Sequence, residues 1–348
     1  MIRYGILGFG LHAARRLMPG FARASGSRVT ALYRRNLDDA RASAAQYDIP
    51  HAFDSAPDLC RCPEVDAIFV ASPNNLHLEH VLLAIEAGKP VLCEKPMAMT
   101  SEECRQMVEA ARSAKALLGV AQVFRFNRSI EKLREQIAIG HLGKPVFVRS
   151  EFSLAGRTHA RKWLNDRKIA GGGPIADVGV HCIDSLRWIL DDEIKAVSAI
   201  GISDQDSGDV ESAAVLSLEF TRGTLGSVQV STRADYRTPL EIIGESGSAK
   251  AINAFSVDNP VEITVRHGNA IGKETVSNAD AYARQVDAFS AAVETKATFL
   301  ISGEEGWQNQ EVLDAAFRSL KTGKLELVPS IRTQCKGLKS EARRPSCA

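Results

Sequence analysis

The sequence predicts an α/β domain built on a doubly wound parallel sheet, followed by an α+β domain with a large open, mainly antiparallel sheet. Three observations predict it. Short apolar runs alternate with amphipathic helical segments up to about residue 122, a glycine turn follows the first run directly, and strands in series dominate further along. The length of 348 residues suits two domains. We expect domains at 1–122 and 123–330 and a mobile tail at 331–348.

The composition is that of an ordinary soluble globular protein, with 45% hydrophobic residues, 24% charged residues and a net charge of +1. This balance gives no electrostatic reason to expect nucleic acid or a membrane as partner. No apolar run approaches the length of a membrane span, and the N-terminal MIRYGILGFG does not resemble a cleavable signal. We therefore expect a cytoplasmic protein that acts on a small molecule.

The seven cysteines form an odd set without a paired CxxC spacing. Cys60 and Cys62 have no histidine or cysteine partner at a distance typical of zinc ligands. We expect reduced thiols and no metal site.

A glycine-rich turn at residues 8–13 links a strand at 2–7 to an amphipathic helix that runs to about Ala24. Such a GxGxx[G/A] turn between a strand and a helix is typical of dinucleotide binding. Gly8 allows the tight turn, Gly10 lets a pyrophosphate approach the backbone, and Ala13 lets the helix pack closely. A plain strand-to-helix connection is the alternative. The turn residues expected to contact the cofactor are Gly8, Phe9, Gly10, Leu11 and His12.

The second strand, Arg28 to Tyr33, is followed by Arg34 and Arg35, where NAD-binding proteins place an acid for the ribose 2′-OH. An arginine can instead bind a 2′-phosphate, so the sequence favours NADP(H), with NAD(H) possible. The alternative is a solvated pair at a helix entrance, because aspartates at positions 38 and 39 lie close.

The alternation continues with a helix from Leu37 to Gln46, a strand from Asp66 to Ala71 and a helix from about Leu78 to Ala87. The turn before this last helix again follows a buried strand, so it belongs to the expected ligand-binding edge. Asn75 has an alternative role as the helix cap. The cofactor candidates in this turn are Ser72, Pro73, Asn74, Asn75 and His77.

A lysine ends the next short buried strand, Val91 to Cys93, where Glu94 and Lys95 precede a proline. Ligands of open α/β sheets bind at the carboxyl ends of the strands, so both side chains are candidates for the site. The alternative is the start of a surface loop. A capping box at Thr100 then opens a helix with one buried face, and a strand follows at Leu117 to Gln122.

Beyond Arg125 the pattern becomes mostly β. The two closing helices carry apolar stripes, one with Tyr282 and one with Val312, that we interpret as core. The expected elements are a helix at 129–139, strands at 145–152, 210–220, 224–232, 240–243, 248–252 and 261–266, and those two helices.

The stretch GGGPIADVGVHCID at 171–184 contains the second chemical cluster. In a helix from about Ala176 to Leu190, Asp177, His181 and Asp184 lie at i, i+4 and i+7 on one face. A histidine flanked by two carboxylates can act as a general acid or base near neutral pH. A structural role for an Asp-x-x-x-His pair is the alternative.

GFGLHA, SPNNLH, CEKP and GGGPIADVGVH occur in an order and at separations that resemble the Gfo/Idh/MocA family of glucose-fructose oxidoreductase and inositol dehydrogenase, over about residues 1 to 330. The resemblance implies a Rossmann domain, an α+β domain whose open sheet mediates homo-oligomers (dimers or tetramers), and NAD(P)-dependent chemistry on sugars or polyols. It implies Lys95 as the catalytic lysine, Asp177 as the substrate-site carboxylate and His181 as the proton donor or acceptor. A cis peptide before Pro96 is frequent in relatives.

The expected reaction moves a hydride between NADP(H) and a secondary alcohol or ketone of a carbohydrate. His181 exchanges the hydroxyl proton and Lys95 stabilises the alkoxide, although Lys95 can also share the base role. An NAD(P)-dependent glycosidase that uses transient oxidation and a non-catalytic nucleotide sensor are the alternatives. Further substrate candidates, with surface or packing roles as their alternative, are Arg125, Arg157, Trp163 and Asp184.

Overall fold

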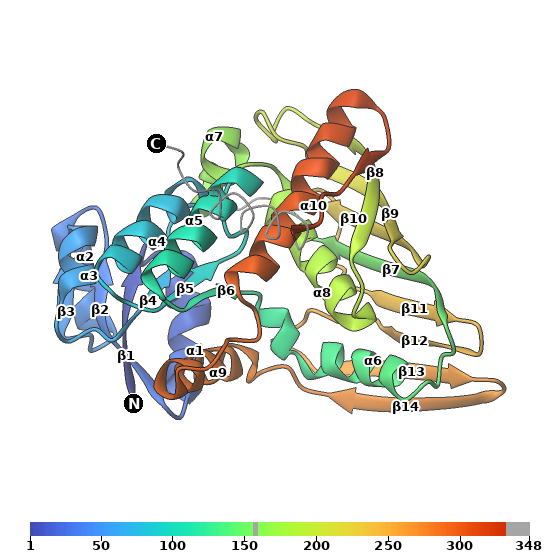
Figure 1. Ribbon diagram of the computed structural model, residues 1–348, viewed down its shortest axis with the longest axis horizontal. Helices are drawn as coiled ribbons and strands as arrows, with labels where there is room; N and C mark the ends of the chain where they lie inside the picture. The colour runs from blue at the N-terminus through green and yellow to red at the C-terminus, as the bar shows by residue number, and fades with distance from the viewer. Residues whose placement is uncertain (156–158, 332–348) are drawn as a thin grey trace, which may run out of the picture.

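The computed structural model describes residues 1–155 and 159–331 and contains two sheets side by side (Figure 1). The first is a six-stranded parallel sheet in the order β3-β2-β1-β4-β5-β6, which confirms the doubly wound fold. Its strands are β1 (Ile2–Leu7), β2 (Ser27–Tyr33), β3 (His51–Phe53), β4 (Ala67–Val70), β5 (Val91–Glu94) and β6 (Leu118–Ala121). Its helices are α1 (Met18–Arg23), α2 (Leu37–Gln46), α3 (Ala56–Arg61), α4 (His77–Glu86) and α5 (Ser101–Ala114).

Local sequence signals account for most of these boundaries. Helix α2 has the predicted bounds, and its cap Asn36 accepts a hydrogen bond from the amide of Asp39. Thr100 caps α5 as expected, through its side-chain oxygen. Strand β3 and helix α3 were not expected, because neither is long enough to show a clear period.

The second sheet has nine strands in the order β14-β13-β12-β11-β7-β10-β9-β8-β15. Its pairs are antiparallel except β7 with β10, so the expected mainly antiparallel sheet is confirmed. The strands are β7 (Pro145–Ser153), β8 (Ile194–Ile202), β9 (Ala213–Phe220), β10 (Leu225–Ser231), β11 (Leu240–Gly244), β12 (Gly247–Ala251), β13 (Val261–His267), β14 (Ala270–Val276) and β15 (Glu326–Leu327).

Helices cover the face of this sheet that looks toward the first domain (Figure 1). They are α6 (Arg128–Ala138), α8 (Val180–Leu190) and α10 (Gly303–Thr322), and the short α7 (Arg167–Ala170) lies nearby. The register places Phe147 beside Leu225 and Ile200 beside Val215 on the opposite face. All four side chains are exposed, which leaves an apolar surface on the outside of the sheet.

The two closing helices, α9 (Ala281–Thr295) and α10, return to the first domain. Ser290 of α9 forms a buried hydrogen bond of 2.7 Å with the hydroxyl of Tyr4, and Asp287 accepts hydrogen bonds from the amides of Ser25 and Gly26. Helix α10 packs against α5. The C-terminal part of the chain therefore packs against both domains.

Two π-helical turns, η1 (Ala13–Leu17) and η5 (Ile175–Gly179), interrupt the expected helices that follow the glycine turn and the triglycine. In the parts of the chain that the structure describes, no helix is long and apolar enough to cross a membrane. Five cysteines there are unbonded and buried, at positions 60, 62, 93, 104 and 182. The predicted tail lies outside the described residues apart from Ile331.

Candidate active site

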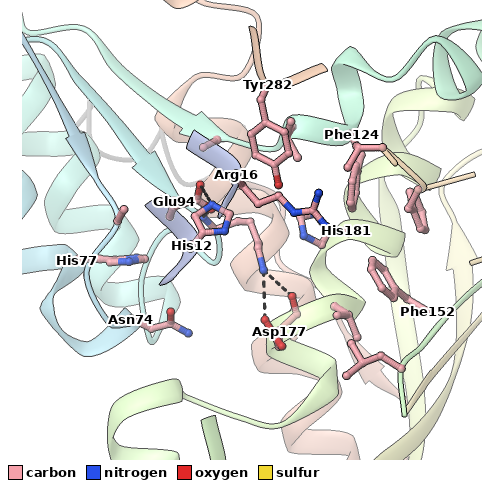
Figure 2. Close-up of a pocket in the computed structure, with 18 of the residues that line it drawn as sticks. His12, Arg16, Asn74, His77, Glu94, Phe124, Phe152, Asp177, His181 and Tyr282 are labelled. Carbon is pink, nitrogen blue, oxygen red and sulfur yellow. Dashed lines mark hydrogen bonds and ion pairs between the residues drawn. The ribbon is translucent and has the colours of Figure 1, made fainter. Parts of the chain in front are cut away.

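A cavity of about 320 Å³ opens between the two domains, at the carboxyl ends of the parallel strands (Figure 2). Residues of both halves line it, including Lys95 from the first domain and Asp177 and His181 from the second. This edge is where open α/β sheets bind their ligands. The structure thus brings together the two chemical clusters that lie far apart in the sequence.

Lys95 follows β5 directly and reaches across the cavity to the η5 turn. Its ammonium group donates to the backbone oxygen of Asp177 at 2.7 Å and lies 3.4 Å from the Asp177 carboxylate. The two side chains are only 14% and 13% exposed, so water screens this pair weakly. The peptide bond between Lys95 and Pro96 is cis, as expected.

His181 is the second residue of α8, and its ring lies among aromatic side chains. Phe124 is 4.4 Å from it between ring centroids and Phe152 is 6.1 Å away. Burial and the nearby Lys95 ammonium lower the pKa of His181 well below its usual value, although the Asp177 carboxylate acts in the opposite direction. Its buried Nδ1 has no hydrogen-bond partner among the described residues. A neutral imidazole of this kind can accept a proton from a hydroxyl group.

Asp184 does not line the cavity beside His181, contrary to the expectation of two flanking carboxylates. It forms a bidentate pair with Arg125, at 2.7 and 2.9 Å, and accepts a hydrogen bond from Asn309. The Arg125 and Asp184 side chains are each 2% exposed. Neither lines the cavity, so their contacts support a packing role rather than the expected contact with substrate.

The glycine turn fits a dinucleotide. Gly8 has a φ of +89°, and a Cβ there would lie 2.4 Å from the Cα of Ser72, so the backbone demands glycine. At Gly10, by contrast, a Cβ would meet nothing within 4 Å. Packing within the protein does not explain that glycine, whereas close approach of a pyrophosphate does.

His12, at the end of the turn, forms a hydrogen bond of 2.9 Å with the Glu94 carboxylate (Figure 2). Burial raises the pKa of Glu94, but His12 and Lys95 outweigh that effect and the pKa is lowered. Both side chains line the cavity. Their hydrogen bond links the glycine turn to the residue before Lys95.

The turn after β4 contributes unequally. Ser72 and Asn74 line the cavity, and Asn74 donates to the backbone oxygen of Ala170 at 2.8 Å. Asn75 is exposed and does not cap α4, which begins without a side-chain cap. His77 is fully buried, with both ring nitrogens directed at backbone oxygens.

Arg34 lies just beyond β2, where it was expected, but its guanidinium already has protein partners. It is 2.8 Å from the Ser43 hydroxyl and 3.3 Å from the Asp39 carboxylate. Arg35 is exposed. This arrangement matches the alternative of a pair at a helix entrance, and it leaves a weak, partly exposed ion pair that a 2′-phosphate could replace.

The sequence did not predict two residues of the cavity wall. Tyr282, interpreted as core, and Arg16, which was not singled out, both line the cavity, and Arg16 pairs with Asp258 at 2.7 Å. Trp163, predicted as a substrate contact, also lines the cavity, whereas Arg157 lies outside the described residues. The basic pattern of the first helix did not distinguish Arg16 from a solvent-exposed arginine.

No group of three or more potential metal ligands occurs within residues 1–155 and 159–331.

Comparison with known proteins agrees with this geometry. Residues 2–122 match the family described as "Oxidoreductase family, NAD-binding Rossmann fold", and residues 130–250 match the "GFO/IDH/MocA C-terminal domain". The 1,5-anhydro-D-fructose reductase of Ensifer adhaerens is 32% identical over 88% of this chain and 92% of that protein. The D-xylose 1-dehydrogenase (NADP(+)) 2 of Haloferax volcanii is 31% identical over 92% of this chain and 98% of that protein.

The crystal structure of an aldose-aldose oxidoreductase from Caulobacter crescentus, complexed with glycerol, superposes with a TM-score of 0.87 at 26% identity. The match covers 94% of this chain and 99% of that one. These relatives are thus similar to this chain over nearly its whole length, and the two family matches cover both domains in the same order. The chain belongs to the Gfo/Idh/MocA family of oxidoreductases.

Proposed function

We propose that this oxidoreductase transfers a hydride between NADP(H) and a secondary alcohol or ketone of a sugar, a polyol or a derivative. The convergence of Lys95, Asp177 and His181 in one cavity beside the Gly8 turn carries this proposal. The site combines a cation, a carboxylate and a neutral imidazole, which together can exchange the proton of a hydroxyl group.

The cofactor would lie along the carboxyl edge of the parallel sheet, with its pyrophosphate at Gly10 and at the free amides of the helix that follows. When bound, the nicotinamide supplies or accepts the hydride. Ser72, Asn74 and Glu94 would border it, since all three line the cavity. Phe124 and Phe152 on the opposite wall exclude water around His181.

His181 is the proton acceptor in alcohol oxidation because its lowered pKa keeps the imidazole neutral at neutral pH. The Lys95 ammonium donates a hydrogen bond to the substrate oxygen and stabilises the negative charge that develops there. Asp177 holds Lys95 through its backbone oxygen and carboxylate. In reduction the same groups act in reverse, with the proton returning from His181.

The choice of NADP over NAD depends on Arg34 and Arg35, since no carboxylate directly follows β2. A 2′-phosphate offers Arg34 a stronger charge-assisted partner than the exposed Asp39 carboxylate does. The name of the Haloferax volcanii relative, which includes NADP(+), supports the same choice. The names of the other relatives refer to aldoses and anhydrofructose, which supports a carbohydrate substrate.

We also propose that copies of the chain associate through the outer face of the nine-stranded sheet. The exposed pairs Phe147 with Leu225 and Ile200 with Val215 form an apolar surface there, and Ile200 is 77% exposed. Such a surface is typical of a protein interface. A dimer or tetramer through this face is the expected state.

Cofactor absorbance on a panel of sugars and polyols tests the proposed activity. Net formation or consumption of NADPH supports it, with Lys95→Ala and His181→Ala both expected to lower turnover. Release of reducing sugar without net cofactor change would indicate the glycosidase instead. Unchanged turnover in both variants would contradict the assigned roles.

A further inference from the structure

His77 lies between the turn that follows β4 and the turn that follows β5 (Figure 2). It is the first residue of α4 and has no exposed surface. Its Nδ1 is 2.9 Å from the backbone oxygen of Pro96, and its Nε2 is 2.9 Å from that of Ser72. One carbonyl belongs to the residue after Lys95 and the other to the turn after β4. Because the ring is rigid, it fixes the separation of these two turns.

Ser72 extends this connection to the glycine turn at residues 8–13. The missing Cβ of Gly8 would lie 2.4 Å from the Cα of Ser72, so the two backbones are in direct contact. His80, one helical turn further along α4, contacts the Ser72 hydroxyl with its Nδ1 at 3.0 Å. His80 thus holds Ser72 alone, whereas His77 holds Ser72 and the residue that follows Lys95.

Burial lowers the pKa of His77, and the carbonyl contacts and Glu94 only partly offset this. His77 borders the cavity, but it has no exposed surface, and both of its ring nitrogens face backbone oxygens of the two turns.

We propose that His77 is a positioning residue for Lys95. It sets the distance between the turn that contains Ser72 and the turn that contains Lys95. In this way it places the Lys95 ammonium group relative to the glycine turn and to Asp177. This inference rests on the proposed function, in which Lys95 stabilises the substrate oxygen. The sequence predicted a cofactor contact for His77, and the proposal gives this residue a positioning role instead.

The test compares His77→Leu with the matched control His80→Leu, a second buried histidine of the same helix. A misplacement of about 1 Å in a reactive group can lower a rate by about 100-fold. We expect His77→Leu to lower kcat by about 10- to 100-fold, with KM and the NADPH dissociation constant changed less than about threefold. His80→Leu should change kcat by less than about threefold. His77→Gln, which keeps an N–H donor, should recover part of the loss.

A second readout does not depend on turnover. Lysines are labelled with an amine reagent and the peptides are analysed by mass spectrometry. The labelling rate measures how accessible the Lys95 amine is to the reagent. His77→Leu should raise the labelling rate of Lys95 severalfold relative to Lys250, since Lys95 loses its alignment with Asp177. If no substrate is turned over, the proposed function fails while this readout still tests His77. Equal kcat losses in both leucine variants, a loss confined to cofactor binding, or unchanged Lys95 labelling would each overturn the proposal.

Discussion

Replacement of Lys95 by methionine removes the ammonium group while keeping most of the volume of the side chain. The structure gives this group two hydrogen-bond partners on Asp177 and places it in the wall of the cavity. Loss of one donor to a developing oxyanion costs about 2.7–4 kcal/mol, or about 100- to 1,000-fold in kcat. We expect Lys95→Met to show a loss of this size.

The same change alters the pH profile in a defined direction. The Lys95 ammonium lowers the pKa of His181, and the Asp177 carboxylate raises it. Without Lys95 its repulsion is gone, while burial and His12 still lower the pKa and Asp177 still raises it, so the pKa of His181 rises relative to the wild type. Alcohol oxidation needs neutral His181, so the rate falls once the pH drops below that pKa. The acid limb of kcat/KM must therefore move to higher pH in Lys95→Met than in the wild type.

The assay is NADPH formation from pH 4 to 9 with Lys250→Met, an exposed strand residue, as control. A loss in kcat below about threefold would refute the role of Lys95 as oxyanion donor. An acid limb that stays in place or moves to lower pH would refute the electrostatic link to His181. If the acid limb disappears altogether, Lys95 is itself the base.

Three other predictions follow from individual contacts. Arg34→Asp should weaken NADPH binding about 10- to 100-fold and NADH binding much less, measured by cofactor fluorescence; equal effects would remove the 2′-phosphate argument. Asp184→Asn should lower the free energy of unfolding in urea by about 3–5 kcal/mol while substrate KM stays within about threefold, because it breaks a buried pair; a raised KM at unchanged stability would restore a substrate role. Phe147→Asp should reduce the mass measured by light scattering, and an unchanged mass would exclude this sheet face as the interface.

The sequence predicted the features that depend on neighbours along the chain. Apolar runs located most strands, and Thr100 marked a helix start because capping is a local interaction. The position of Lys95 was predictable for a related reason. A charged residue that ends a buried parallel strand must emerge at the edge where its sheet binds ligands.

Partners distant in the sequence were not predictable in the same way. Helical spacing put Asp184 on the same side as His181, but its true partner Arg125 lies 59 residues away and Asn309 lies 125 residues away. The π-helical turn before α8 also changes the angular spacing that the argument assumed. Tyr282 shows the same limit, because an apolar stripe indicates a buried face without saying whether protein or a cavity lies against it.

The contacts that cross the cavity differ in what they can stabilise. The pair of Arg16 with Asp258 is 39% and 65% exposed, so water screens it and it contributes little to holding the domains together. The pair of Lys95 with Asp177 is far better shielded and crosses the same cavity. The stronger electrostatic link between the domains is therefore made by the groups assigned to catalysis. A substrate oxygen that binds Lys95 must share its N–H donors with Asp177, so substrate binding and domain contact draw on the same ammonium group.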